Sequence, residues 1–176
     1  MSAWTVITHT ELSSGSAADI VFSSIPSSYT DICLVVSGRS TTPEASNGAI
    51  MKIEPNSSSA NGSIRYLQGT GSAASSTTDS YIWARLNSTS YTASTFANTS
   101  VYIANYASSN NKSISIDTAN ENNATANRMA ITAGLWSDSA AISSLRILPE
   151  GGSFAQYTSA TLYGITKGSS GGVTVS

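Results

Sequence analysis

Apolar residues recur along this chain with a period of two rather than with the helical period of 3.6. In residues 112–117, Ile114 and Ile116 alternate with Ser113 and Ser115, which places both isoleucines on one face of an extended strand. Similar short runs rich in Val, Ile, Tyr and Trp repeat along the chain, and clusters of Gly, Asn, Ser and Pro separate them. The pattern therefore predicts an all-β protein.

Eleven strands are predicted, each ending where turn-forming residues begin. They cover residues 4–8, 19–22, 31–37, 49–54, 64–68, 81–86, 100–104, 113–118, 128–134, 144–148 and 160–165. Parallel strands need crossover connections, usually helices, and the sequence shows no helical pattern that could supply them. We therefore expect a single-domain antiparallel β-sandwich that is jelly-roll-like.

The chain has 176 residues, which is enough for one such domain to close its core without disulfides. We assign residues 1–167 to the sandwich and residues 168–176 to a Gly- and Ser-rich C-terminal tail. Residues 69–80 contain only Gly, Ala, Ser and Thr before Asp79, and this low complexity predicts a mobile surface loop.

Charge argues against several classes of partner. Charged residues make up only 10% of the chain and the net charge is −2, with Lys and Arg scattered, so neither nucleic acid nor an anionic membrane is expected as a partner. No apolar stretch approaches the roughly 20 residues that span a bilayer, and residues 1–30 lack the features of a signal peptide. The single Cys33 lies in an apolar run and is expected to be buried.

Candidate catalytic residues are scarce. His9 is the only histidine, and because it lies among threonines near the N-terminus we expect a surface or edge residue rather than a general base. Sites built on several His and Cys ligands are excluded by count. Glycoside hydrolysis needs two carboxylates in one groove, whereas the ten Asp and Glu residues are scattered, often in predicted turns. We expect no enzyme and no cofactor, with a polysaccharide hydrolase as a third hypothesis.

One segment could hold a cation. Residues 117–123 concentrate side-chain oxygens, and Asp117, Asn120 and Glu121 are the candidate ligands for calcium, which takes six to eight oxygens. The alternative is an Asn-rich turn in which the side-chain amides bind their own backbone.

Aromatic residues offer a second kind of site, because Tyr and Trp rings stack on sugars. Tyr81, Trp83 and Tyr91 are the candidates for carbohydrate stacking. Tyr81 and Trp83 share one face of a predicted strand, which favours packing in the core or against another subunit over a sugar platform.

Several segments resemble a family of small β-sandwich virion proteins of tailed bacteriophages. The segments that carry this resemblance are residues 22–31 (FSSIPSSYTD), 36–40 (VSGRS), 99–106 (TSVYIANY), 134–137 (GLWS), 141–142 (AI) and 159–165 (SATLYGI). The resemblance implies a structural role in the virion and covers nearly the whole chain.

Two roles follow from this resemblance. The first is a capsid decoration, or cement, protein on the head surface, with the major capsid protein and further copies of itself, as a homotrimer, for partners. The second is a tail-fibre module that binds a receptor or a host surface glycan. We rank decoration first, because the first predicted strand follows Met1 closely and no coiled coil precedes it.

Contacts with the capsid or with other subunits are expected at the chain ends, which can reach neighbouring molecules. Trp4, Val6 and Ile7 in the first predicted strand are the candidate contact residues, together with the C-terminal tail. Strand edges that lack Lys or Pro also invite pairing with another chain.

Overall fold

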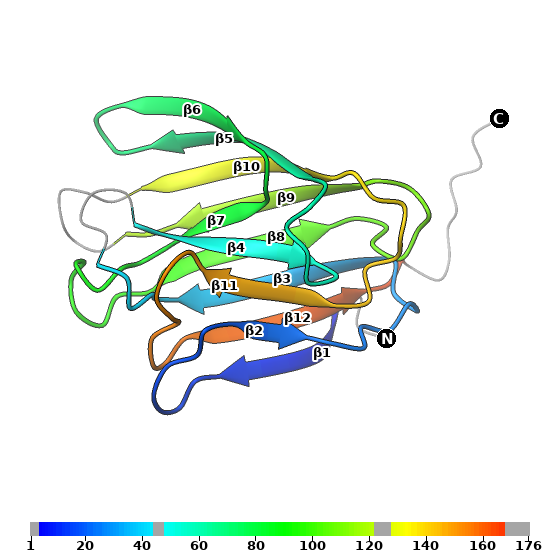
Figure 1. The fold of residues 1–176 in the computed structure, drawn as a ribbon, viewed down its shortest axis with the longest axis horizontal. Coiled ribbons are helices and arrows are strands. Elements are labelled where there is room, and N and C mark those ends of the chain that lie inside the picture. Colours follow the sequence, from blue (N-terminus) through cyan, green and yellow to red (C-terminus); the bar gives the residue numbers. More distant parts are fainter. Residues whose placement is uncertain (1–3, 44–47, 122–127, 168–176) are drawn as a thin grey trace.

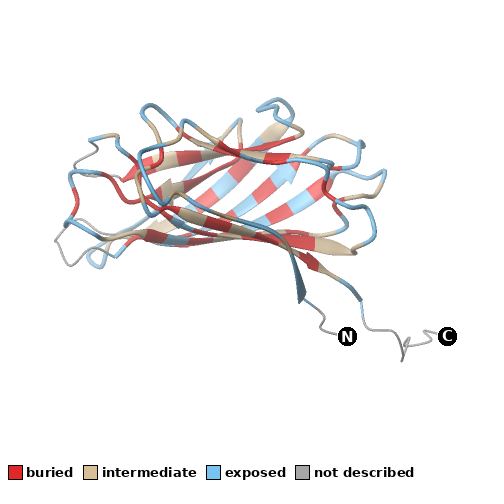
Figure 2. Cartoon of the chain, turned by 90° about the horizontal axis from the view of Figure 1, so that it is seen from below, coloured by how far each residue is buried: buried red, intermediate tan, exposed pale blue. Residues whose placement is uncertain are grey.

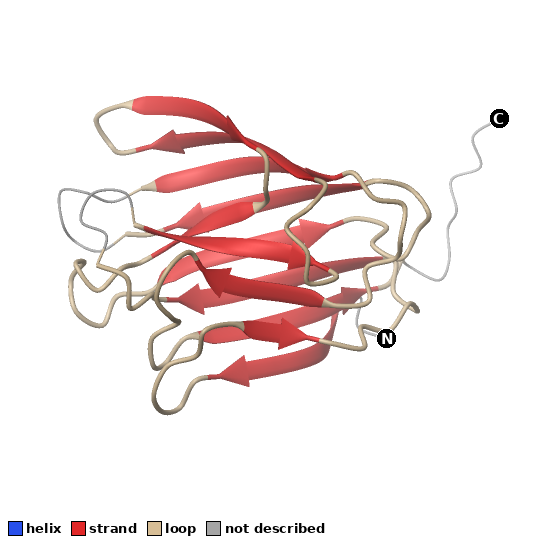
Figure 3. Cartoon of the chain, in the orientation of Figure 1, coloured by secondary structure: helices blue, strands red, loops and turns tan. Residues whose placement is uncertain are grey.

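A computed structural model describes residues 4–43, 48–121 and 128–167 of the protein. In this part of the chain there are twelve strands and no helix (Figure 3). The strands are β1 (Trp4–Glu11), β2 (Ile20–Phe22), β3 (Asp31–Gly38), β4 (Ala49–Pro55), β5 (Gly62–Gly69), β6 (Ala74–Asp79), β7 (Trp83–Leu86), β8 (Ala97–Ile103), β9 (Lys112–Ala119), β10 (Met129–Trp136), β11 (Leu145–Pro149) and β12 (Ser159–Ile165). The described residues therefore include no helix long and apolar enough to cross a membrane. The predicted tail, residues 168–176, lies outside the described residues.

The strands form two sheets that pack face to face (Figure 1). The larger sheet has eight strands in the order β1-β12-β3-β8-β9-β10-β5-β6, and the smaller has four in the order β2-β11-β4-β7. Every pairing is antiparallel. The prediction of a single-domain antiparallel β-sandwich is therefore confirmed.

The core lies between the sheets, and the period-two pattern selects the residues that enter it. In β9 the burial alternates at every residue, so Ile114 and Ile116 are buried while Ser113 and Ser115 face outward. Figure 2 shows the same alternation along neighbouring strands of the larger sheet. From the smaller sheet, Met51, Ile53, Leu145 and Ile147 close the core and are almost completely buried.

Strand β6 was not predicted. Residues 74–79 pair with β5, with Ser76 opposite Leu67, so the prediction of a mobile loop over residues 69–80 was wrong for this part. All residues of β6 except the half-buried Asp79 are exposed, because β6 is an edge strand that the smaller sheet does not cover. With neither face buried, no alternation of apolar and polar residues is required, and the sequence signal for a strand disappears.

Two buried cations tie loops to the sandwich. The Nη1 atom of Arg39 donates to the carbonyl oxygens of Thr92 and Thr95, each at 2.9 Å. The Nζ atom of Lys112 donates to the carbonyl oxygens of Ser108 at 2.8 Å, Asp138 at 3.3 Å and Ala140. Burial lowers the pKa values of both side chains. The hydrogen bonds that each charged group donates to loop carbonyls offset the cost of burying its charge.

Candidate binding surface

The outer face of the larger sheet is the broad surface that the smaller sheet leaves open. The strand registers define which side chains share it: one row across the sheet contains Val6, Tyr163, Cys33, Tyr102, Ser115, Ala133, Arg65 and Thr78. The next row contains Thr161, Val35, Ser100, Asp117, Ile131, Leu67 and Ser76. These rows allow each candidate contact residue to be placed relative to the others.

Four large apolar side chains gather on this face over β5 and β10, and we call them the apolar stripe. Leu67 is 54% exposed, Met129 62%, Ile131 60% and Leu135 40%. Ile131 lies directly opposite Leu67 in the register, so the stripe is continuous across the two strands. Because isolated apolar residues are normal on a protein surface but clusters indicate an interaction site, the stripe is a candidate contact surface.

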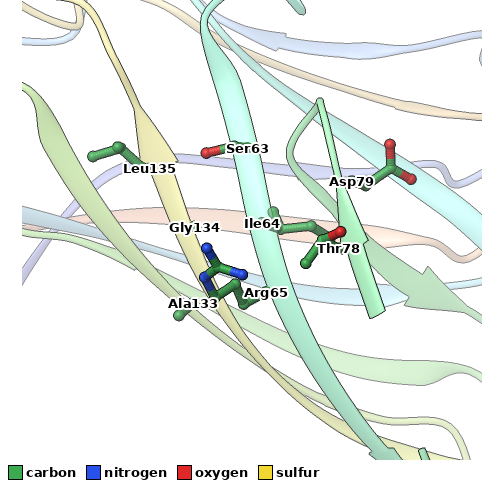
Figure 4. Close-up of a pocket in the computed structure, with 8 residues that line it drawn as sticks. All are labelled: Ser63, Ile64, Arg65, Thr78, Asp79, Ala133, Gly134 and Leu135. Carbon is green, nitrogen blue, oxygen red and sulfur yellow. The ribbon is translucent and has the colours of Figure 1, made fainter. Parts of the chain in front are cut away.

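Grooves run along the stripe. One, with a volume of about 420 Å³, is lined by Ser63, Arg65 and Thr78 together with Ala133 and Leu135 (Figure 4). A second, of about 200 Å³, has an almost wholly apolar lining that includes Leu67, Met129 and Ile131. The small side chains beside the stripe thus leave its large ones accessible.

A second apolar group lies at the opposite end of the same sheet, on edge strand β1. Trp4 is 48% exposed and Val6 is 55% exposed, and the Trp4 ring packs edge-on against Tyr163 with the centroids 5.7 Å apart. Ile7 follows Val6 and projects to the opposite face of the strand, where it packs against the core, and the register of β1 shifts between Val6 and Thr8. Of the three predicted contact residues, Trp4 and Val6 are thus substantially exposed, whereas Ile7 packs on the core.

Polar side chains separate these two apolar groups. Ser100, Ser115 and Asp117 lie on the outer face of β8 and β9, between β1 and β10 in the sheet. Nearby, the hydroxyl of Tyr102 donates to Asp31 Oδ2 at 2.6 Å. This hydrogen bond to a carboxylate, reinforced by burial and by the negative charge, raises the pKa of Tyr102 to about 12, so the phenol stays neutral at physiological pH.

Cys33 lies on the outer face between Tyr163 and Tyr102, and it is nevertheless only 2% exposed. Burial raises the pKa of its thiol, which lies 3.6 Å from the Ser100 hydroxyl. The thiol is therefore protonated at neutral pH and unsuited to nucleophilic chemistry. The expectation of a buried cysteine is confirmed.

The three candidate calcium ligands do not converge. Asp117 is exposed on the outer face of β9, whereas Asn120 is fully buried and its Nδ2 lies 3.4 Å from the carbonyl oxygen of Leu86. Glu121 is exposed. Since Asp117 and Asn120 project to opposite sides of the strand, they cannot hold one ion together. The remainder of the predicted segment, residues 122 and 123, lies outside the described residues.

The aromatic candidates are mostly buried. Trp83 is 3% exposed, Tyr91 is 6% exposed and Tyr81 is half-buried. Trp83 packs against Tyr66 and Arg85 with its Nε1 donating to Asp79 Oδ2 at 3.2 Å, so its ring faces are used within the protein. Trp83 and Tyr91 thus offer no open ring face to a sugar, and Tyr81 is the one predicted stacking residue with substantial exposure.

His9 lies on β1, where its Nδ1 is 2.7 Å from the Thr161 hydroxyl, as expected for an edge residue. Among the residues that the structure describes, no group of three or more His, Cys, Asp or Glu side chains could hold a metal ion. The described surface is therefore characterised by its apolar groups rather than by clustered metal ligands.

The apolar stripe was missed in the sequence, although a signal was present. Residues 129–136 are apolar or small on both faces, whereas neighbouring β9 alternates isoleucine with serine and aspartate. A strand that is apolar on both faces, in a sandwich with one face open, indicates an exposed apolar surface. This comparison between neighbouring strands requires the strand order, which the sequence alone does not provide.

No known protein family, curated protein or solved structure matches this chain. The resemblance to bacteriophage virion proteins therefore stays a prediction from the sequence segments described above.

Proposed function

We propose that this chain is a bacteriophage structural protein that binds the head surface as a capsid decoration protein. The observation that supports this most directly is the exposed apolar group on β1, where Trp4 and Val6 lie on an edge strand of the larger sheet. Together with the resemblance to virion proteins, this edge favours a role in binding a neighbouring protein surface.

The edge of β1 has two ways of making contact. In the described part of the chain β1 has a neighbouring strand, β12, on one side only, so a capsid segment could be added as a strand along its other side. Trp4 and Val6 would then pack against the same segment. No Lys or Pro in β1 protects the edge, and the bulge after Val6 limits regular pairing to its first residues.

A tail-fibre module that binds a host glycan is the second candidate. It is favoured by the groove over β5 and β10, which combines the polar Ser63, Arg65 and Thr78 with the apolar Leu135 (Figure 4). Such a mixture of polar and apolar groups is typical of pockets that bind small ligands. In this role the groove, rather than the edge of β1, would make the specific contacts.

Binding to purified phage heads that lack the chain tests the first candidate. Deleting residues 1–8 would not test this contact alone, because the deletion also removes the pairing of β1 with β12 and the packing of Ile7 on the core. We expect the double substitution Trp4→Ala and Val6→Ser to weaken binding to heads by at least about tenfold, with the thermal unfolding midpoint little changed.

Val21→Ser is the matched control, since Val21 is 48% exposed on the smaller sheet, away from β1. If the Trp4 and Val6 substitutions leave the affinity for heads unchanged, the proposed contact is refuted. Immunogold label at the tail tip instead of the head would favour the glycan-binding module.

A further inference from the structure

We propose that the apolar stripe is the interface of a two-fold symmetric dimer in which two copies of this chain pack outer face to outer face. The inference concerns β5, β9 and β10, at a distance from the β1 edge, so it goes beyond the proposed binding to capsids. It rests on the stripe, on the charges beside it and on the shape of the surface between them.

The charges have the symmetry that a dimer requires. Arg65 on β5 lies opposite Ala133, and Asp117 on β9 lies opposite Ile131, so the two charged residues flank β10 on either side. Neither forms an ion pair among the described residues, and both are exposed. The midpoint between them falls on β10 between Ile131 and Ala133, at the centre of the stripe.

A two-fold axis through this midpoint pairs the charges twice. The axis lies between the two faces and is perpendicular to the line from Arg65 to Asp117. It brings Arg65 of each copy against Asp117 of the other, which is the arrangement of a self-complementary, isologous interface. Within one copy these residues lie on strands separated by β10 and form no ion pair with each other.

The same axis also matches apolar residues. With strands about 4.8 Å apart and a rise of about 3.4 Å per residue, it places Leu67 of one copy over Met129 and Ile131 of the other. The strands of the two copies then cross at about 70°, which is near the orthogonal class of sheet packing. The charged pairs and the apolar contacts are thus satisfied by one arrangement.

The surface around the stripe permits close approach. Gly69, Ala74, Ala119 and Ala133 surround the large apolar side chains, and no lysine lies on these strands' outer faces. Four strands over seven residues give a footprint of about 450 Å² per copy, which is at the small end for specific interfaces. We therefore expect a reversible dimer whose population depends on concentration in the micromolar range.

Sedimentation velocity on the full chain over a range of concentrations tests the interface. The wild-type protein is expected to shift from the mass of one chain to that of two as concentration rises, and Ile131→Lys is expected to remain monomeric. Val6→Ser is the matched control, since Val6 is exposed on the same face at the far end of the sheet. Unfolding midpoints close to wild type establish that each variant is folded.

Charge exchange tests the symmetry. Arg65→Glu places two acidic residues together across the interface and Asp117→Arg places two basic ones, so each variant alone should dimerise at least about tenfold more weakly. An equimolar mixture of the two should dimerise again, because each contact then joins opposite charges.

Three results would overturn the proposal. The first is a wild-type chain that stays monomeric at every concentration or forms a trimer. The second is a dimer that Ile131→Lys leaves intact, which would place the interface elsewhere. The third is a mixture of the Arg65 and Asp117 variants that fails to associate, which would exclude the two-fold pairing.

Discussion

Gly164 in β12 leaves the space that the Tyr29 ring occupies. A Cβ added at residue 164 would lie 2.4 Å from Cγ and Cδ2 of Tyr29, which is far inside van der Waals contact. We expect Gly164→Ala to lower the free energy of unfolding by about 2–3 kcal/mol, because the ring must move out of a packed position. Chemical denaturation measures this loss.

Gly69→Ala is the control at the same scale. Gly69 ends β5, and a Cβ added there would lie 3.7 Å from Cγ of Met129, an ordinary contact. Its effect on stability should be small, and the contrast with residue 164 isolates the contact with Tyr29. Equal losses for the two variants would contradict this explanation.

Lys112 joins three parts of the chain at the scale of elements. It begins β9, and its ammonium group binds carbonyls in the segment after β8 and in the segment after β10, while lying 5.3 Å from the centroid of the Trp136 ring. Lys112→Met keeps the length of the side chain and removes the donor. We expect a loss of about 3 kcal/mol in the free energy of unfolding, because hydrogen bonds from a charged donor are lost and the carbonyls are left partly unsatisfied.

Lys167→Met is the matched control, because Lys167 is exposed and follows β12. Denaturation should show almost no change for this variant. A loss below about 0.5 kcal/mol for Lys112→Met would mean that water replaces the ammonium group without cost.

The contrast between β9 and β6 explains how much of the fold the sequence could predict. Strands with one buried face, such as β9, can be recognised by their alternation of apolar and polar residues, and eleven strands were predicted to within a few residues. β6 has no buried face and was missed. The apolar stripe was harder to predict. The exposure of Met129 and Ile131 depends on which face of β10 the smaller sheet covers, and this depends on the strand order.

At the scale of the whole molecule, the last strand completes the sheet that the first strand begins. β12 lies between β1 and β3 and pairs with both, so residues near the two ends of the chain are neighbours in the sheet (Figure 1). Such long-range pairing carries a high cost in loop-closure entropy before any contact forms. The larger sheet therefore cannot close until nearly the whole chain is available.

Two truncated chains test this dependence. Every described strand lies within residues 4–165, so a chain that ends at Lys167 should keep its cooperative transition and a midpoint within about 2 °C of the full chain. A chain that ends at Thr158 loses β12, so β1 has no strand to pair with. The loss of the buried Leu162 also exposes Leu34, which lies opposite it. We expect no cooperative thermal transition for this shorter chain, measured by circular dichroism. A cooperative transition near the wild-type midpoint would mean that the remaining strands close the sandwich by themselves, and that β12 is an addition to the fold rather than a condition for it.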